Sequence, residues 1–579
     1  MRLSIIFITF FILNLGLKAQ VDFTSKFEKT NGSETVTYYE GIEYYRILDE
    51  HFASVKLIEI GTTDAGFPLH LVLFNTDEEF DLSVIKNSGK GVLFINNAIH
   101  AGETDGVDAS MMLIRNLAQG KILKDSSKNI VVAVIPFFNV GGVLNRSKYN
   151  RVNQNGPSEV GFRGNARSLN LNRDFSKANT KNMWGFWDIF HKLDPDFFID
   201  THVSNGADYQ YTITLISNQK DKLSPLIKPL LEGAIKPYMY DYMEQKQYPL
   251  TPYINVYGVT QPDEGLTEFP DWPRYSSGYV NLFQTIGFIT ESHMLKPNKE
   301  RVMATYHFIT GLADYLSKST QTIIEARAKS KLLVAEQKEF AIKWELDGTK
   351  STKINFKGYE GSFTKSSVTK QPRLFYNRNK PYEKWVDYYN FFKPSVVVSA
   401  PKFYLVSKAW DDVVLRLKAN GVVTKTINHD TTISVSAYRI EDYETMKNPY
   451  EGHYPHTSVV LSKTVESVKF FKGDYMIEVN QPTNRFIVEM LEPKGEDSFF
   501  KWNFFDPILD RKEHFSGYVF EEIAESILNE NPKLNKQFRA LQKDSVFASN
   551  RYTQLDWIYK KSPYFEKTYL LYPVFRIEH

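Results

Sequence analysis

Short apolar runs alternate with longer amphipathic stretches in the first half of the chain, between about residues 40 and 315. The runs are rich in Val, Ile and Phe and are bounded by polar, Gly or Pro positions, which predicts strands buried on both faces. They cover residues 91–97, 130–138, 197–203 and 286–290. Between them, stretches such as 182–192 carry apolar residues at three- and four-residue spacing, as amphipathic helices do. This alternation predicts an α/β fold with a mixed, largely parallel sheet flanked by helices.

The pattern changes after a helix predicted over 298–316 and a long polar helix predicted over 320–340. β-Branched or alternating segments then become frequent, which is typical of antiparallel strands. Examples are 395–399, 422–428, 431–438 and 475–479, with one helix within 405–421 and a helical segment over 521–562. We therefore expect a first domain over 20–317, a helical linker over 318–345 and a β-rich α+β C-terminal region over 346–579. That last region divides further into about 346–460 and 461–579.

The first 19 residues have the pattern of a secretory signal peptide. Arg2 provides the positive charge, residues 3–17 are largely apolar, and Ala19 is a small residue just before a cleavage point at Gln20. A retained membrane anchor is the competing interpretation, but the run is shorter than the roughly 20 residues that a spanning helix needs. We expect a secreted or periplasmic protein with no stable membrane insertion after signal cleavage.

Charge and cysteine content narrow the function classes further. Lys and Arg number 70 against 68 Asp and Glu, so the formal net charge is only +2 and gives no reason to expect nucleic acid as a partner. The chain has no cysteine, so the mature protein depends on its cores without disulfides. Any metal must then be bound by His, Asp or Glu.

Two strand ends carry residues with the chemistry of a zinc site. His100 and Glu103 follow the run 91–97 in a Gly-containing loop, and His202 ends the run 197–203. Ligands bind at such strand ends in α/β sheets, and catalytic zinc commonly takes two His and one Glu, with a fourth position for water. Asp200, two residues before His202, lies on the same face and is expected to orient it. Taken singly, the first pair also fits an exposed loop, and His202 also fits a core histidine.

Further motifs occur in the order of a known family. After His-Ala-Gly-Glu at 100–103 come Asn-Val-Gly-Gly at 139–142, the segment RGNARSLNLNRDF at 163–175, Asp-Thr-His at 200–202 and Thr-Glu at 290–291. Together they resemble the zinc carboxypeptidases of the carboxypeptidase A type, over roughly residues 40–315. The resemblance implies a catalytic domain with that family's fold and one zinc ion per chain. It also implies a peptide substrate with a free C-terminal carboxylate.

The resemblance also implies residue roles. His100, Glu103 and His202 would bind the zinc, Asn172 and Arg173 would clamp the substrate carboxylate, Glu291 would be the catalytic base, Arg163 would stabilise the oxyanion, and Tyr275 would cap the substrate. A planar guanidinium suits a carboxylate because it bonds both oxygens, and a carboxylate beside zinc-activated water can take its proton.

Several of these roles have rivals. Arg151 and Arg146 compete with Arg163, because the insert at 150–162 makes the alignment ambiguous, and Tyr279 competes with Tyr275. His293 is expected to play a supporting or structural role. An acidic stretch over 263–271 hints at a basic substrate residue, although a solvated loop is the favoured explanation.

The preferred function is a secreted zinc metallocarboxypeptidase. A zinc amidase acting on cell-wall peptides or acylated amino acids is the alternative, since its substrates also offer a carboxylate to Arg173. A catalytically silent binding protein on the same scaffold is the third hypothesis. In the C-terminal region, residues 448–453, 473–475, 491–493 and 497–503 resemble the region that trails some exported bacterial members of the family. We expect that region to pack against the first domain or to shape access to its site, with sugar binding as the alternative.

Overall fold

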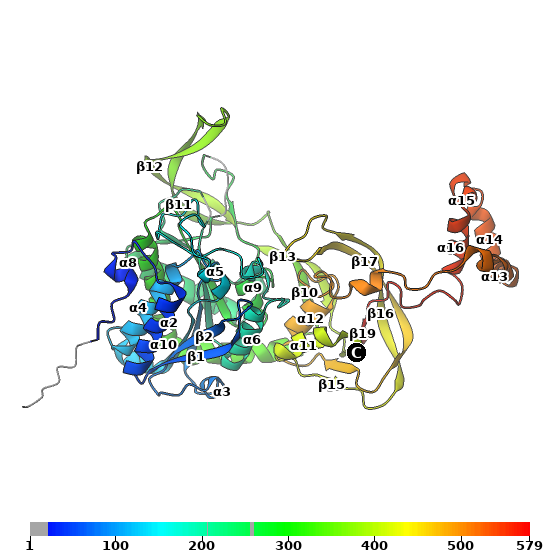
Figure 1. The fold of residues 1–579 in the computed structure, drawn as a ribbon, viewed down its shortest axis with the longest axis horizontal. Helices are drawn as coiled ribbons and strands as arrows, with labels where there is room; N and C mark the ends of the chain where they lie inside the picture. The colour runs from blue at the N-terminus through cyan, green and yellow to red at the C-terminus, as the bar shows by residue number, and fades with distance from the viewer. Residues whose placement is uncertain (1–20, 205–206, 255–259) are drawn as a thin grey trace, which may run out of the picture.

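The computed structural model describes residues 21–204, 207–254 and 260–579, so the predicted signal peptide at 1–19 lies outside the described residues. An eight-stranded sheet occupies the centre of the first half of the chain (Figure 1), with the strand order β1-β2-β4-β3-β5-β9-β6-β7. Its strands are β1 (Val55–Thr62), β2 (Pro68–Phe74), β3 (Gly91–Asn96), β4 (Ile130–Ile135), β5 (Phe197–Val203), β6 (Ile213–Ser217), β7 (Leu250–Pro252) and β9 (Ile286–Ser292).

The sheet is mixed and largely parallel, as predicted. The pairs β3–β4, β3–β5, β5–β9 and β6–β7 run parallel, whereas β1–β2, β2–β4 and β6–β9 run antiparallel. The four predicted runs are β3, β4, β5 and β9, and every residue of β3, β4 and β5 is buried. They lack polar–apolar alternation because helices cover both faces of the sheet.

Successive residues of the central strands enter different cores. Phe94 joins a core on the face covered by α6, whereas Leu93 and Ile95 join a core on the face covered by α2, α4 and α10. The helices of this half are α1 (Lys26–Lys29), α2 (Tyr38–His51), α3 (Leu82–Ile85), α4 (Asp105–Ala118), α5 (Val140–Leu144), α6 (Lys181–Leu193), α7 (Ile227–Leu230), α8 (Lys236–Gln245), α9 (Ser276–Asn281) and α10 (Asn298–Glu336). Within the described ranges, none of the helices is long and apolar enough to span a bilayer.

Helix α10 is one continuous helix of 39 residues, whereas the sequence pattern predicts two. Its second half also stays on the first domain. The buried side chain of Arg327 forms ion pairs of 2.7 Å with both Asp194 and Asp196, which lie between α6 and β5. The predicted linker over 318–345 is therefore helical only as far as Glu336, and β10 begins at Glu339.

The C-terminal region is rich in antiparallel strands. The hairpin of β11 (Thr352–Lys365) and β12 (Pro372–Tyr389) projects from the molecule and pairs at its base with β8 (Leu266–Thr267) (Figure 1). β10 (Glu339–Leu346) pairs with β13 (Phe392–Ser399). A six-stranded sheet has the order β15-β18-β14-β19-β16-β17. Its strands are β14 (Phe403–Val406), β15 (Lys425–Thr426), β16 (Thr431–Thr445), β17 (His456–Phe470), β18 (Tyr475–Glu478) and β19 (Val574–Ile577).

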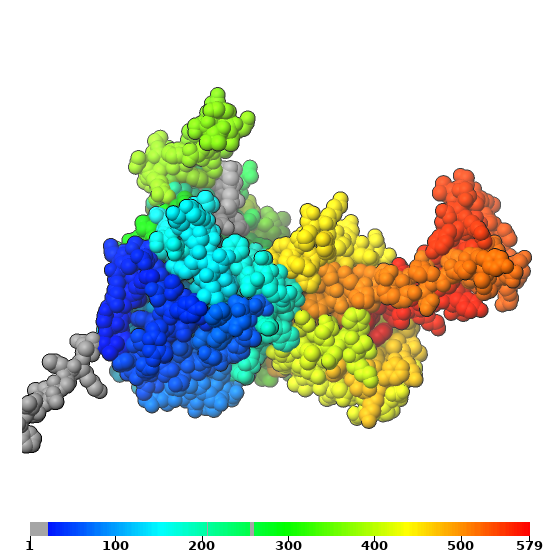
Figure 2. Space-filling view, viewed as in Figure 1, coloured from blue at the N-terminus to red at the C-terminus, as the bar shows by residue number. Residues whose placement is uncertain are grey.

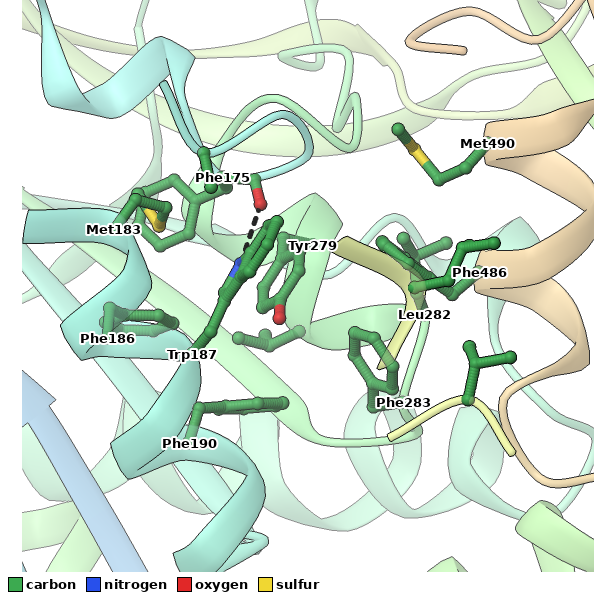
Figure 3. Close-up of a cluster of buried hydrophobic side chains, with 14 of the residues drawn as sticks. Phe175, Met183, Phe186, Trp187, Phe190, Tyr279, Leu282, Phe283, Phe486 and Met490 are labelled. Atoms are coloured by element: carbon green, nitrogen blue, oxygen red, sulfur yellow. Dashed lines mark hydrogen bonds between the residues drawn. The ribbon is translucent and has the colours of Figure 1, made fainter. Parts of the chain in front are cut away.

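One hydrophobic core continues from the first domain into the C-terminal region. It contains Trp187 and Tyr279 of the first domain together with Phe486 and Met490 of helix α12 (Asn484–Leu491). Figure 3 shows Tyr279 between Trp187 and Phe283, with Phe486 on the other side of Phe283. The space-filling view in Figure 2 shows the two parts against each other over a broad face. Helix α11 (Asp411–Ala419) adds Val413, Val414 and Leu417 to the same core.

Four helices stand apart at the far end of the C-terminal region (Figures 1 and 2). They are α13 (Gly517–Glu530), α14 (Pro532–Leu541), α15 (Ser545–Ser549) and α16 (Arg551–Tyr559), and we call them the helical module. The module has a small core of its own, built around Phe520, Phe538 and Tyr559. The segment predicted as helical over 521–562 is this module.

Candidate metal centre and active site

Three neighbouring parallel strands end at the candidate site. β3 leads into the loop of His100 and Glu103, β5 carries His202 as its penultimate residue, and β9 carries Glu291. In the sheet, His202 lies opposite Glu291, and Asn96 lies opposite Asp200. The carboxyl ends of parallel strands share one edge of a sheet, so the topology itself brings these residues together.

The loop after β3 needs tight turns and close packing. Ala98 has a left-handed backbone with φ of 54°, an uncommon conformation for a residue with a Cβ atom, which turns the chain out of the strand towards His100. Gly106, in the first turn of α4, allows that helix to lie directly on β5. A Cβ atom there would come within 2.0 Å of the Thr201 hydroxyl, so only glycine fits.

His100, Glu103 and His202 are buried together and form a candidate metal site. The two Nδ1 atoms lie 3.2 Å apart, and Glu103 Oε2 lies 3.1 Å from Nδ1 of His100 and 3.0 Å from Nδ1 of His202. A tetrahedral zinc ion with bonds of about 2.0–2.2 Å sets its ligand atoms roughly 3.3 Å apart. Both the donor atoms and their spacing therefore fit zinc.

The other imidazole nitrogens are held by neighbouring side chains. Nε2 of His100 lies 3.0 Å from Asn170 Oδ1, and Nε2 of His202 lies 3.1 Å from Asp200 Oδ2. Asp200 is fixed in turn by the side-chain amide of Asn96, which donates to its Oδ1 at 3.1 Å. These contacts leave both Nδ1 atoms facing Glu103, the orientation that metal-binding histidines need.

The three side chains differ in protonation. Burial lowers the pKa of His100 to about 4, so its imidazole is neutral at pH 7, as a metal ligand must be. Burial alone lowers the pKa of His202, but the Asp200 and Glu103 carboxylates outweigh it and raise this pKa well above the usual value. Burial also raises the pKa of Glu103, but His100 and Arg151 outweigh it and hold this carboxyl ionised.

Two of the three candidate oxyanion arginines lie at the site. Arg151 donates to Glu103 Oε1 at 2.9 Å and Arg163 donates to the same oxygen at 3.3 Å. The Arg163 side chain is 40% exposed, against 11% for Arg151, so Arg163 has more freedom to meet a substrate. Arg146 instead donates to the carbonyl oxygens of Val36 and Glu159.

The turn at 139–142 fixes the backbone of Arg163. The Asn139 amide donates to the Arg163 carbonyl at 3.0 Å, and its Oδ1 accepts from Gly142 N at 2.9 Å. This contact explains physically why an Asn-x-x-Gly turn accompanies the site.

The candidate carboxylate clamp lies in the segment that follows. Asn172 is buried, and its Oδ1 has no hydrogen-bond partner among the described residues. Arg173 donates from Nη1 to the Asn172 carbonyl at 2.6 Å, and its guanidinium lies 4.6 Å from the centre of the Tyr275 ring. Its Nε donates to the Tyr450 hydroxyl of the C-terminal region at 2.9 Å, a partner that sequence motifs of the first domain do not predict.

The Glu291 carboxyl has the electrostatic environment of a proton acceptor. Burial raises its pKa to about 7, and the Glu103 carboxylate adds to the rise, whereas His202 and Arg163 oppose it. A group with a pKa near the working pH can take up and release a proton with similar ease. The Glu291 carbonyl accepts from the Thr214 hydroxyl at 3.1 Å, which helps to fix this position of β9.

The tyrosine candidates occupy different environments. Tyr275 lies against Arg173, whereas Tyr279 is fully buried in the core (Figure 3). Its hydroxyl donates to Asn420 Oδ1 at 2.5 Å, so Tyr279 is placed as a core residue and Tyr275 as the candidate beside the clamp. Tyr253, which the sequence motifs do not single out, lies just after β7. Burial raises its pKa, and the charges of Glu291 and Glu103 add to the rise, so its phenol lies near the site.

His293 and the acidic stretch have structural roles. His293 is fully buried, packs against the Tyr209 ring with centroids 4.2 Å apart and planes tilted by 45°, and lies 3.4 Å from Asp208. Asp271 is also buried and accepts from the Ser277 hydroxyl at 2.6 Å, at the start of α9. Burial raises the pKa of Glu268 to about 8, so this side chain does not offer a fixed negative charge to a basic substrate.

Part of the chain matches a known protein family. Residues 43–196 match the zinc carboxypeptidase family. Over 108 residues the chain is 32% identical to Carboxypeptidase 2 of Trichophyton rubrum, and this match covers 18% of the chain and 20% of that protein. The chain thus matches about a fifth of the length of this curated relative.

Two solved structures are similar in part. One is the carboxypeptidase A from Helicoverpa armigera, with a TM-score of 0.37 and 15% identity over 51% of this chain and 74% of that one. The other is a metallo-carboxypeptidase from Burkholderia cenocepacia, with a TM-score of 0.35 and 16% identity over 48% of this chain and 68% of that one. The family match includes His100, Glu103, Asn172 and Arg173, whereas His202 and Glu291 lie beyond its end.

Proposed function

Because residues 43–196 match the zinc carboxypeptidase family, we propose that this protein is a zinc metallocarboxypeptidase acting on peptides with a free C-terminal carboxylate. One observation carries the proposal. Three adjacent strand ends bring together a zinc-type triad and the Glu291 carboxyl group, whose pKa is about 7. Arg163 lies near enough to interact with the negative charges of Glu103 and Glu291 and with the positive charge of Arg173. A metal site, a proton acceptor and a carboxylate anchor therefore lie within one site.

In this mechanism His100, Glu103 and His202 would hold the zinc, which when bound would supply Lewis acidity and lower the pKa of a nearby water. Arg173 receives the terminal carboxylate through its free N–H groups and so orients the last peptide bond. Glu291 accepts a proton from the attacking water and delivers it to the amine nitrogen as the C–N bond breaks.

Arg163 acts on the developing charge. Its half-exposed guanidinium moves from Glu103 to the carbonyl oxygen of the scissile bond as negative charge develops there. Fixed positive charge at that oxygen is a large catalytic contribution in acyl-transfer sites. The buried Asn172 Oδ1 offers an acceptor that a substrate N–H group, and not the carboxylate itself, can satisfy.

We further propose that the protein is exported. The support is the sequence pattern of residues 1–19, with Arg2 followed by an apolar run and a small residue at Ala19. Mass determination of the N-terminus of protein recovered outside the cytoplasm tests this point. An N-terminus near Gln20 is expected, and an intact Met1 in recovered mature protein contradicts it.

Product mapping tests the enzymatic function. A mixed peptide library is incubated with the full chain, with and without a chelator, and with matched peptides whose C-terminus is amidated. We expect zinc-dependent loss of single C-terminal residues from the unblocked peptides only. Equal cleavage of amidated peptides would argue against a carboxypeptidase, and cleavage only of acylated amino acids or cell-wall peptides would favour the zinc amidase.

Glu291→Gln is the matched variant for this assay. The substitution keeps the shape of the side chain but removes its capacity to accept a proton, so we expect turnover to fall by at least about a thousandfold. Zinc content, measured by elemental analysis, should stay at one ion per chain. Retained turnover would exclude Glu291 as the base, and loss of zinc would show that the substitution disturbs the metal site.

A further inference from the structure

Two motifs of the C-terminal region meet the candidate carboxylate clamp. They are residues 448–453, in the connection between β16 and β17, and residues 497–503, which follow α12. The first contains a tight turn over residues 450–453, which we call the C-terminal turn. Tyr450 N donates to the His453 carbonyl at 2.8 Å, and His453 N donates back at 3.1 Å. Both central residues have positive φ, 50° at Glu451 and 78° at Gly452, as in the tightest hairpin turns.

The C-terminal turn contacts the part of the first domain that holds Asn170, Arg173 and Asn179. The Tyr450 hydroxyl accepts from Arg173 Nε at 2.9 Å. Glu451 Oε2 accepts from Asn170 N at 2.7 Å, and Asn170 is the residue whose Oδ1 lies 3.0 Å from Nε2 of His100. His453 hydrogen bonds with the side chain of Asn179. One turn thus braces the anchor arginine and, through Asn170, a candidate metal ligand.

The contacts of the Arg173 guanidinium fix its orientation. A guanidinium has five N–H groups; Tyr450 takes the one on Nε and the Asn172 carbonyl takes one on Nη1. The Tyr275 ring covers one face. In the part of the chain that the structure describes, no hydrogen-bond partner takes the remaining N–H groups of Nη1 and Nη2, and the rotation of the fork is fixed from three sides. A fork held in this way bonds both oxygens of a carboxylate at less entropic cost.

Tyr450 is itself held firmly. Its ring stacks on the fully buried Trp502 with centroids 6.1 Å apart and planes 19° apart. The Trp502 indole donates to Asp497 Oδ1 at 3.1 Å, and Asp497 Oδ2 accepts from the backbone N of Arg274, next to Tyr275. The two C-terminal motifs therefore support both aromatic neighbours of Arg173.

We propose that the C-terminal region completes the substrate-carboxylate site, with Tyr450 as the positioning residue that orients Arg173. The proposal rests on the proposed function, since it assigns the carboxylate of a peptide to Arg173. The hydroxyl proton of Tyr450 has no acceptor among residues 21–204, 207–254 and 260–579, so it is available to a carboxylate oxygen bound beside Arg173. The region is then part of the enzyme's active site as well as of its fold.

Tyr450→Phe tests the proposal because it removes one hydroxyl and keeps the ring on Trp502. We expect KM for unblocked peptides to rise about tenfold, with kcat within twofold, since the loss falls on carboxylate binding. Zinc content and Tm should not change. Tyr454→Phe is the matched control, because that ring lies four residues away and is 51% exposed. An unchanged KM in Tyr450→Phe overturns the proposal.

A binding measurement separates this proposal from the proposed function. Zinc-loaded full chain carrying Glu291→Gln is titrated calorimetrically with N-acetylated amino acids whose carboxyl group is free or amidated. We expect a preference for the free carboxylate that Tyr450→Phe reduces about tenfold and Tyr454→Phe retains. If the wild-type protein cleaves no peptide but this pattern holds, the proposed function fails and the inference stands. If the carboxylate preference is absent, or survives in Tyr450→Phe, the inference is wrong.

Discussion

Each histidine at the candidate metal site divides its two nitrogens between two tasks. Nε2 of His100 and of His202 contact Asn170 and Asp200, and the two Nδ1 atoms face Glu103. These contacts fix the orientation of both rings before any ion binds, which favours metal binding. Arg173 likewise uses two of its donors on groups of the protein, the Tyr450 hydroxyl and the Asn172 carbonyl.

A buried acid away from the metal ligands gives a test of how the first domain responds to pH. Asp108 is fully buried in α4, and burial raises its pKa to about 8, against the opposing effect of the Thr35 hydroxyl. Its pKa in the unfolded chain is about 3.8. Folding therefore favours the protonated acid, and the stability it contributes at low pH is lost as pH rises from about 4 towards 8.

Asp108→Asn should remove the loss of stability at higher pH, because asparagine has the shape of the protonated acid and never ionises. We expect Tm of the variant, relative to wild type, to increase by several degrees between pH 5 and pH 8. Thermal unfolding at a series of pH values measures it. A difference in Tm that stays constant over this range would show that Asp108 is ionised in the folded protein.

The sequence predicts the site residues that lie at the ends of predicted strands, but not a contact between residues that are far apart in the chain. His100, Glu103, His202 and Glu291 lie at the ends of strands that the apolar pattern reveals, and the order of the motifs resembles a family whose model matches residues 43–196. Tyr450 lies 277 positions from Arg173. No periodicity or spacing rule relates residues so far apart, so only the packing of the two regions reveals this contact.

At the scale of elements, the continuity of α10 changes how its second half is interpreted. The second half of α10 has a polar surface and few apolar residues per turn, so its sequence suggests a helix that does not pack on the domain. In the structure it contacts the domain through charged side chains. Arg327 donates to Asp194 and Asp196, and Asp196 Oδ2 accepts from Val92 N at the start of β3. Buried ion pairs carry no apolar signature, so the sequence pattern did not predict this attachment.

Arg327→Met should therefore destabilise the first domain. Removing one partner of a buried ion pair leaves uncompensated charge and typically costs about 3–5 kcal/mol, so we expect a clear drop in Tm. Lys329→Met on the same helix is the control, because its side chain is 66% exposed, and it should leave Tm within about a degree. Equal changes in Tm from the two substitutions would mean that the Arg327 ion pairs do not hold the second half of α10 to the domain.

At the scale of the whole molecule, the first domain and the C-terminal region differ in their patterns of apolar residues but share one hydrophobic core. That core contains Trp187 and Tyr279 of the first domain and Phe486 of α12, and it keeps the C-terminal turn at a fixed distance from Arg173. The predicted boundaries at 317 and 345 stay predictions, but a boundary there would cross this core. The helical module is different, because its core is separate.

The helical module should be dispensable for catalysis. Its two ends come together, with Lys512 N donating to the Glu566 carboxylate at 3.0 Å, so residues 513–565 can be replaced by a short Gly-Ser linker. We expect kcat/KM on unblocked peptides to stay within twofold and the main thermal transition to stay unchanged. Leu555→Asp, which disrupts only the module core, is the companion variant. Loss of activity in both would assign the module a role in the active site.

The position of β19 in the six-stranded sheet has a consequence for biosynthesis. The hairpin of β16 and β17 carries the C-terminal turn, and β19 lies between that hairpin and β14. Residues 574–577 leave the ribosome after every other strand, so the hairpin cannot dock until translation has passed them. A nascent chain would hold Arg173 without its partner Tyr450. The tight carboxylate binding that this contact is inferred to support would then arise only after β19 has been synthesised.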